Sequence, residues 1–272
     1  MTIINNITRR NVLHGIAGGG IVLIAGCTGR DSNDESPDAV ALERLTVEET
    51  DLVIEFVDDH GIDEITVIQP DGALFAEQRI ATGVTRETID IGMTYPPGEF
   101  EVIGSSDGDE QFSEPITIQP EVHIDELLLG RNHPDEMFED ASERRTRMEA
   151  IVRVRNDGTG ADALTNLIFT GDVPRPTPED DEQSGIYDTE SETRNHADEA
   201  VIHPGESITI YSYSRPFTSV TDNVSCTPDT EEGEFEVSVF TRIQPENPSL
   251  TYSVSYTGEE MAECDIEIEQ QQ

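Results

Sequence analysis

Residues 148–155 read Met148-Glu149-Ala150-Ile151-Val152-Arg153-Val154-Arg155. Met148, Ala150, Val152 and Val154 fall on one side of this alternation, and Arg153 and Arg155 fall on the other. Because successive side chains of a β-strand point to opposite faces, the pattern predicts a strand with one face in a core and one toward solvent. The turn-forming residues at 156–160 then predict the end of that strand.

The same alternation occurs repeatedly before this strand. Leu52, Ile54 and Phe56 share one face of a predicted strand, as do Phe100 and Val102 in another. Clusters of Gly, Pro and Asp separate these short pieces, as they do in antiparallel sandwiches. We predict strands at 42–47, 51–57, 62–69, 73–80, 88–91, 99–104 and 114–119.

Pro120 is a suitable boundary between this region and a second one with further strand patterns. Residues 131–143 form a charged insert, 174–199 a long acidic loop that we expect to be mobile, and 201–206 a turn. The sequence therefore predicts an all-β protein with two immunoglobulin-like antiparallel β-sandwich domains, at 40–120 and 121–270. The predicted strands of the second domain are 121–129, 148–155, 163–170, 207–213, 234–241 and 250–257, followed by a last segment at 264–269.

The turn chemistry of the second domain carries a family resemblance. Residues 151–160 end in Asn156-Asp157-Gly158-Thr159-Gly160, and Pro204-Gly205-Glu206-Ser207 precedes a later strand. This arrangement, over roughly 121–269, resembles CARDB-like and related immunoglobulin-type adhesion modules of archaeal and bacterial surface proteins. The resemblance implies a fold more than a function. The acidic loop at 174–199 departs from the compact members.

Residues 1–26 have the pattern of an export signal. Paired arginines precede an uncharged run at 15–26 that is rich in Gly, Ala and Ile. That run is shorter than the roughly 18 to 20 apolar residues of a spanning helix, so we interpret it as a twin-arginine signal peptide. The residues of the export signal are Arg9, Arg10 and Leu13.

Residues 24–27 resemble the lipobox of prokaryotic lipoproteins, which implies that the cysteine becomes the lipidated first residue of the mature chain. An ordinary cleaved signal with an incidental cysteine is the alternative. Residues 27–39 lack an apolar segment to bury and are expected to form a flexible acidic tether. The lipobox residues are Ile24, Ala25, Gly26 and Cys27.

The chain is strongly acidic, with a formal net charge of −42 from 58 Asp and Glu against 16 basic residues, all of them Arg. Such a charge destabilises a compact fold in dilute salt and is screened at molar salt. The composition resembles that of proteins from extremely halophilic archaea, and the whole order resembles uncharacterised lipoproteins of these organisms. A disordered acidic chain, a calcium-binding polyanion and a binder of basic partners are the alternatives. Nucleic acid and anionic membrane surfaces are disfavoured as partners on electrostatic grounds, so we expect no nucleic-acid partner.

With Cys27 assigned to lipid, Cys226 and Cys264 are left as a pair in an exported protein. We predict a disulfide between them, because oxidation is allowed outside the cytoplasm. Two free thiols, or a pair of metal ligands, are the alternatives.

Residues that commonly hold metals or perform catalysis are scattered. The five histidines after the signal, at 60, 123, 133, 196 and 203, form no close ligand pair, and neither Cys226 nor Cys264 is followed by the histidine of a blue copper site. The common hydrolase, metalloprotease and nucleotide-binding motifs are also missing. We therefore expect no cofactor, no metal and no enzymatic activity, with structural calcium at an acidic cluster as an alternative.

Arginines gather at 144–155. On an exposed strand face they are expected to pair with carboxylates of neighbouring strands. The functional alternative is a site for an anionic glycan or a carboxylate, with Arg153 and Arg155 as the contacts.

Together these features predict a protein anchored to the outer face of the cell membrane by lipid on Cys27. Its expected role is binding, adhesion or envelope organisation without catalysis, toward a surface protein or glycan. One alternative is a ligand-binding lipoprotein that serves a transporter or receptor. The other is a secreted hydrolase without a recognisable motif.

Overall fold

The computed structural model describes residues 41–178, 181–189 and 196–271. Within them nearly all regular structure is β, and every paired strand is antiparallel. Two separate hydrophobic clusters lie on the two sides of Pro120, each between two sheets. The prediction of an all-β fold with two immunoglobulin-like sandwiches is confirmed.

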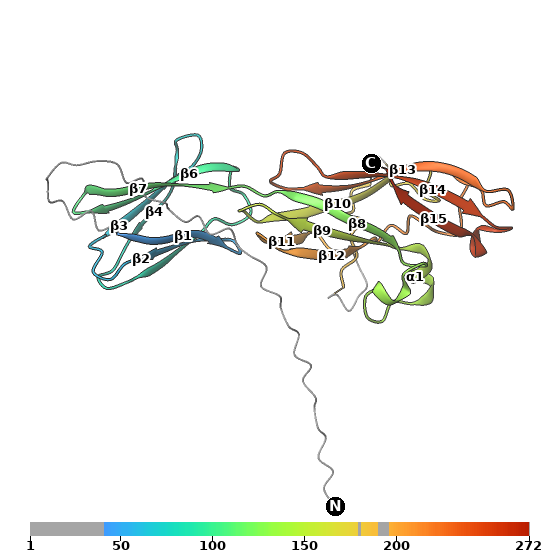
Figure 1. Ribbon diagram of the computed structural model, residues 1–272, viewed down its shortest axis with the longest axis horizontal. Helices are drawn as coiled ribbons and strands as arrows, with labels where there is room; N and C mark the ends of the chain where they lie inside the picture. The colour runs from blue at the N-terminus through green and yellow to red at the C-terminus, as the bar shows by residue number, and fades with distance from the viewer. Residues whose placement is uncertain (1–40, 179–180, 190–195, 272) are drawn as a thin grey trace, which may run out of the picture. The chain divides into compact units, whose positions relative to one another are not determined.

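The first sandwich consists of a three-stranded and a four-stranded sheet (Figure 1). Leu52 and Ile54 of one sheet and Phe100 and Val102 of the other are fully buried, as the alternation predicts. The strands of the first sheet are β1 (Leu42–Glu48), β2 (Asp51–Phe56) and β5 (Arg86–Asp90). Those of the second, in spatial order, are β4 (Leu74–Arg79), β3 (Glu64–Ile68), β6 (Gly98–Ser106) and β7 (Asp109–Ile118).

The second sandwich repeats this topology and adds one strand. In each sandwich the first, second and fifth strands form one sheet, while the third, fourth, sixth and seventh form the other. One sheet consists of β12 (Ser207–Tyr211), β9 (Ala150–Asn156) and β8 (Val122–Leu129). The other consists of β11 (Ala200–Ile202), β10 (Asp162–Gly171), β13 (Glu231–Thr241), β14 (Ser249–Thr257) and β15 (Asp265–Gln270).

The insert between β8 and β9 contains η1 (Pro134–Glu136) and α1 (Glu143–Met148), and a further short helix, η2 (Met261–Glu263), precedes β15. The hydroxyl of Ser142 caps α1 by accepting a hydrogen bond from the backbone N–H of Arg145. Helix α1 corrects the sequence prediction, which placed Met148 in the strand. Met148 is instead the last residue of the helix, and its side chain is buried.

Two further segments differ from the predictions. Val201 and Ile202 belong to β11, which pairs with β10, so the predicted turn begins only at His203. Residues 184–187 of the acidic loop are buried. The carbonyl of Ser184 accepts from Leu167 N in β10, whereas Tyr187 N donates to Tyr211 O in β12. This part of the loop therefore packs across the edges of both sheets of the second sandwich.

Candidate functional site

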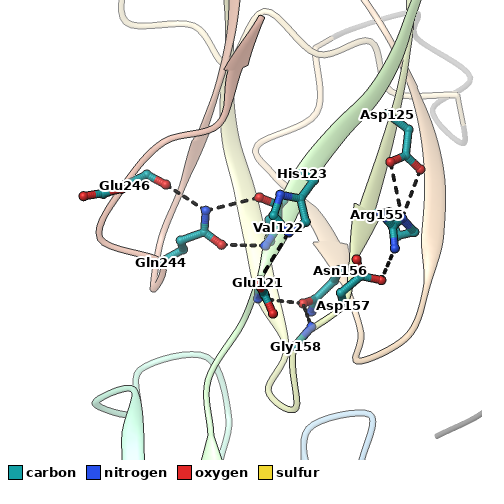
Figure 2. Close-up of polar contacts among 10 residues, drawn as sticks. All are labelled: Glu121, Val122, His123, Asp125, Arg155, Asn156, Asp157, Gly158, Gln244 and Glu246. Carbon is teal, nitrogen blue, oxygen red and sulfur yellow. Dashed lines mark hydrogen bonds and ion pairs between the residues drawn. The ribbon is translucent and has the colours of Figure 1, made fainter. Parts of the chain in front are cut away.

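The two arginines of β9 that face outward are each paired with two carboxylates. Arg153 pairs with Glu126 of β8 and, at 2.9 Å, with Glu136 of the insert. Arg155 lies between Asp125, at 3.2 Å from its Nε, and Asp157 (Figure 2). An incoming anion would compete with two carboxylates at each guanidinium. The arrangement therefore favours the ion-pair interpretation of these residues, and the anion contact remains a prediction.

Asn156, next to this pair, has a structural role that the sequence motif alone does not reveal. Its side chain is fully buried, and Oδ1 accepts hydrogen bonds of 3.0 Å from the backbone N–H groups of Glu121 and Gly158 (Figure 2). Its Nδ2 donates to Gly160 O at 2.8 Å. Gly158 has no room for a side chain, since a Cβ there would lie 2.3 Å from Gln119 O. The Asn-Asp-Gly-Thr-Gly turn thus holds the start of β8.

Gln244, in the loop between β13 and β14, holds the same strand through hydrogen bonds. Its Oε1 accepts from Val122 N at 2.5 Å, and its Nε2 donates to Val122 O and to Glu246 O (Figure 2). These contacts satisfy backbone groups that would otherwise lack partners. The polar residues around β8 and β9 in Figure 2 therefore stabilise the fold.

The predicted disulfide is present. Cys226 and Cys264 are joined with an S–S distance of 2.05 Å, and both are buried. The bond connects the segment before β13 to the residue directly before β15. The prediction of a disulfide is confirmed, so these thiols are neither free nor metal ligands in this structure.

The histidines are not brought together. His60 stacks on Phe56 and accepts from Ile62 N through Nδ1, whereas His196 contacts the ring of Tyr213. In the described part of the chain, no group of three or more His, Cys, Asp or Glu side chains is placed to hold a metal ion. Arg9, Arg10, Leu13 and the lipobox ending in Cys27 lie outside the described residues. Over the described ranges, no helix has both the length and the apolar character needed to cross a membrane.

A buried ion pair was not anticipated from the sequence. Arg145 of α1 and Glu149, directly after it, are 9% and 1% exposed, with Nη1 of Arg145 2.5 Å from Oε1 of Glu149. Oε2 of Glu149 is buried without a hydrogen-bond partner. Burial raises the pKa of Glu149 to about 7, and the charges of Arg145 and Arg215 offset part of that rise.

Aromatic rings cover this pair. The guanidinium of Arg145 lies 4.3 Å from the ring centroid of Tyr187, a cation–π contact, and 5.8 Å from that of Tyr213. Phe138 stacks on Tyr187 at 4.5 Å, and Tyr187 stacks on Tyr213 at 6.4 Å. These rings come from the insert, from the acidic loop and from the segment after β12. Only the fold brings them together, so the sequence carries no local signal for the cluster.

Beside these rings is a small cleft of about 170 Å³. Two segments form it, namely the first part of the acidic loop and the segment after β12. Neither of its two arginines, Arg175 and Arg215, makes an ion pair within the described ranges. The buried Oγ of Ser214 and Nε of Arg215 also lack hydrogen-bond partners there. The lining residues are Arg175, Pro176, Thr177, Pro178, Asp181, Gln183, Gly185, Tyr213, Ser214 and Arg215.

A larger depression on the first sandwich, of about 530 Å³, is wide open to solvent. Glu43, Glu55 and Asp58 line it together with Arg86, whose guanidinium pairs with Glu48 and Glu55. Its one cation is thus already paired with carboxylates. The cleft of the second sandwich is therefore the better candidate for a binding site.

Comparison with known proteins identifies no family. No protein-family model matches the chain, and no curated protein matches it. Among solved structures, a two-domain fibronectin type-III segment of chicken tenascin aligns with 85% of this chain and 96% of its own, at 11% identity and a TM-score of 0.27. A β-glucuronidase of glycoside hydrolase family 2 aligns at 12% identity and a TM-score of 0.21, with 76% of this chain covering 19% of that enzyme. Scores this low carry no functional inference, and the fold assignment rests on the sheets described above.

Proposed function

We propose that the chain is an exported, lipid-anchored protein of the cell surface that presents two β-sandwich domains for non-catalytic binding or adhesion. The observation that carries this proposal is the order of Arg9, Arg10, the uncharged run at 15–26 and Cys27. A twin-arginine signal directs export, and a lipobox cysteine receives the lipid that holds the mature chain at the outer face of the membrane. Residues 27–39 then act as a spacer between lipid and domains.

Two properties of the folded part support an extracytoplasmic location in a salt-rich medium. The disulfide between Cys226 and Cys264 is of a kind that persists in oxidising compartments and is rare in the cytosol. The net charge of −42 suits a protein that folds at molar salt. We assign the source on this basis to a halophilic archaeon.

The polar clusters of the second sandwich hold its backbone in place and are therefore engaged in the fold. For this reason we propose a binding role for the domain and not a catalytic one. Asn156 and Gln244 fasten β8, and the arginines of β9 pair with carboxylates on neighbouring segments. Immunoglobulin-like sandwiches commonly serve as binding modules, which makes this the simplest role for two of them on a tether.

Two variants of the full chain, expressed in a halophilic host, test the proposal. Cys27→Ser is expected to be exported but released into the medium, because the thiol that accepts the lipid is missing. Arg9→Lys combined with Arg10→Lys is expected to leave unprocessed protein in the cytoplasm. Thr28→Ser is the matched control, since it changes the residue next to Cys27 and leaves the thiol in place, and it should remain with the membrane. Retention of Cys27→Ser on membranes at the level of the parent chain would contradict a lipid anchor.

A ligand-binding lipoprotein that serves a transporter or receptor is the second candidate. The cleft bounded by Arg175 and Arg215 favours it, since two arginines that form no ion pair within the described ranges line one cleft. Uptake of a ligand by cells lacking the protein, compared with the parent strain, distinguishes this role from adhesion.

A further inference from the structure

We propose that the cleft of the second sandwich bounded by Arg175, Tyr213 and Arg215 binds an organic carboxylate, held by the two guanidinium groups with its ring or carbon skeleton against Tyr213. The inference does not depend on the lipid anchor, because every residue it uses lies in the folded second domain. The carboxylate is carried either by a free organic acid or by an acidic sugar of a glycan.

Charge is the first reason for this assignment. In a chain with 58 acidic and 16 basic residues, six of the twelve arginines in the described ranges pair with carboxylates, among them Arg44, Arg86 and Arg242. Arg175 and Arg215 belong to different segments, line one cleft and form no ion pair within the described ranges, while the charge of Arg215 also acts on the buried carboxylate of Glu149. Two such cations create a local site for an anion in a protein that repels anions elsewhere.

The carboxylate of Asp181 also lines the cleft, but it already has a hydrogen-bond partner within the protein. Oδ1 of Asp181 accepts a hydrogen bond of 3.0 Å from Gln183 N, which closes a turn of the loop. Among the lining residues that the structure describes, this carboxylate is accompanied by two guanidinium groups.

Unsatisfied donors are the second reason. Ser214 Oγ and Arg215 Nε are buried, belong to adjacent residues and have no protein partner. Neither atom is reached by solvent, and a buried donor without an acceptor is costly, so the protein leaves this segment of the cleft wall incompletely satisfied. A carboxylate suits the two arginines of the cleft, because its two oxygens accept hydrogen bonds from one guanidinium in parallel.

The backbone holds Arg215 in an uncommon conformation. Its φ is +56°, in the left-handed region that residues with side chains seldom adopt. The next residue anchors this geometry, since the carbonyl of Pro216 accepts from Arg175 N at 2.9 Å. One hydrogen bond thus ties together the two segments that carry the arginines.

Tyr213 supplies a rigid wall. Its ring stacks on Tyr187 and contacts His196, and its backbone N–H donates to Gly185 O at 2.7 Å. A flat aromatic surface next to cations suits the carbon face of a sugar acid or a small ring. The volume of about 170 Å³ is below the roughly 300 to 1,000 Å³ of drug-sized sites. The ligand is therefore one small acid or one sugar ring.

Calorimetric titration of the full chain, purified in detergent at molar KCl, tests the proposal. The probes are galacturonate, its neutral counterpart galactose, and the ringless acid lactate. We expect saturable binding of galacturonate and at least tenfold weaker binding of galactose. If galacturonate binds and lactate does not, the ligand is an acidic sugar, whereas equal binding of both identifies a small organic acid.

Three variants place the binding in the cleft. Arg175→Gln removes an exposed cation, and Arg215→Asn removes the second one while keeping a residue that tolerates a left-handed backbone. Each is expected to weaken galacturonate binding at least tenfold. Arg44→Gln, the matched control at a paired arginine, should leave it unchanged. Thermal unfolding of each variant confirms that it is folded before titration.

Absence of saturable binding by either acid would overturn the proposal. Equal binding of galactose and galacturonate would overturn it too, because the carboxylate would then contribute nothing. Parent-like affinity in folded Arg175→Gln and Arg215→Asn would place the ligand elsewhere and reject the cleft.

Discussion

Nη1 of Arg145 and Oε1 of Glu149 are 2.5 Å apart in the interior of the second sandwich, one helical turn from each other. This contact joins α1 to the entry of β9, and the rings of Tyr187 and Tyr213 cover the guanidinium. The second oxygen of Glu149 has no partner, so one guanidinium does not fully compensate the burial of this carboxylate. The pair therefore makes the stability of the fold depend on pH near neutrality.

Stability is expected to fall as pH rises through about 7, because the folded state holds a proton on Glu149 that the unfolded state releases near its ordinary pKa of 4.5. The contribution is fully present below the unfolded pKa and is lost above the folded one. A shift from 4.5 to about 7 corresponds to at most about 3 kcal/mol. Denaturant unfolding of the full chain at molar salt from pH 5 to 8 measures the slope.

Other carboxylates also repel one another more as pH rises, so a variant must isolate this residue. Glu149→Gln keeps the shape of the side chain and removes its titration, and we expect it to flatten the decline. Glu121→Gln, at an exposed carboxylate of the same domain, is the control and should keep the slope of the parent. Identical slopes for all three chains would show that Glu149 does not titrate in this range.

Asn156→Ala is expected to destabilise the chain by about 3 kcal/mol, because the backbone N–H groups of Glu121 and Gly158 and the carbonyl of Gly160 lose their partner. Denaturant unfolding provides the measurement. Asn247→Ala is the matched control, since Asn247 accepts one exposed hydrogen bond, from Thr241 N, and should cost less than about 1 kcal/mol. An equal loss in both variants would argue against a special role of the buried asparagine.

Removing the Cys226–Cys264 bond is expected to lower stability by about 3 to 4 kcal/mol, because a loop with a sequence separation of 38 is no longer closed in the unfolded chain. Thermal and denaturant unfolding of the parent with and without a thiol reductant measure this difference. The double variant Cys226→Ala with Cys264→Ala should match the reduced parent and show no response to reductant. A reductant effect of the same size in that variant would mean that the loss arises elsewhere.

The sequence predicts the first sandwich well, because its strands carry a clear two-residue period. Leu52, Ile54, Phe100 and Val102 lie in the core as expected. The prediction is less complete in the second sandwich, where α1 is six residues long and carries no capping-box glutamate three residues after Ser142. Such a short helix leaves little periodicity to detect, and it is held by the burial of Met148 and the pairing of Arg145.

The candidate cleft could not be predicted for a different reason. Arg175 lies near the start of the acidic loop, whereas Tyr213 and Arg215 follow β12, and the rest of the loop together with β11 and β12 separates them along the chain. They meet because residues 184–187 pack across the edges of both sheets, through hydrogen bonds that involve backbone groups only. Backbone pairing of this kind leaves no residue signature. Arg153 and Arg155, in contrast, share one face of a predicted strand, so the sequence does indicate them as candidate contacts. In the structure each of them is paired with two carboxylates.

Salt is expected to stabilise the chain strongly. With a net charge of −42, the carboxylates of the folded chain repel one another. The length over which salt screens this repulsion falls from about 10 Å at 0.1 M to about 3 Å at 1 M. The free energy of unfolding should therefore rise steeply with KCl over this range, because charges in the folded state lie closer together than in the unfolded chain. Surface ion pairs such as Arg155 with Asp125 weaken at the same time, but each exposed pair contributes only about 0 to 1 kcal/mol.

Denaturation by urea, which adds no charge, measures the effect at each salt concentration. Sucrose at equal osmolality is the control for general exclusion from the surface, and it should stabilise the chain less. A free energy of unfolding that is the same at 0.1 M and 1 M KCl would contradict the dominance of self-repulsion.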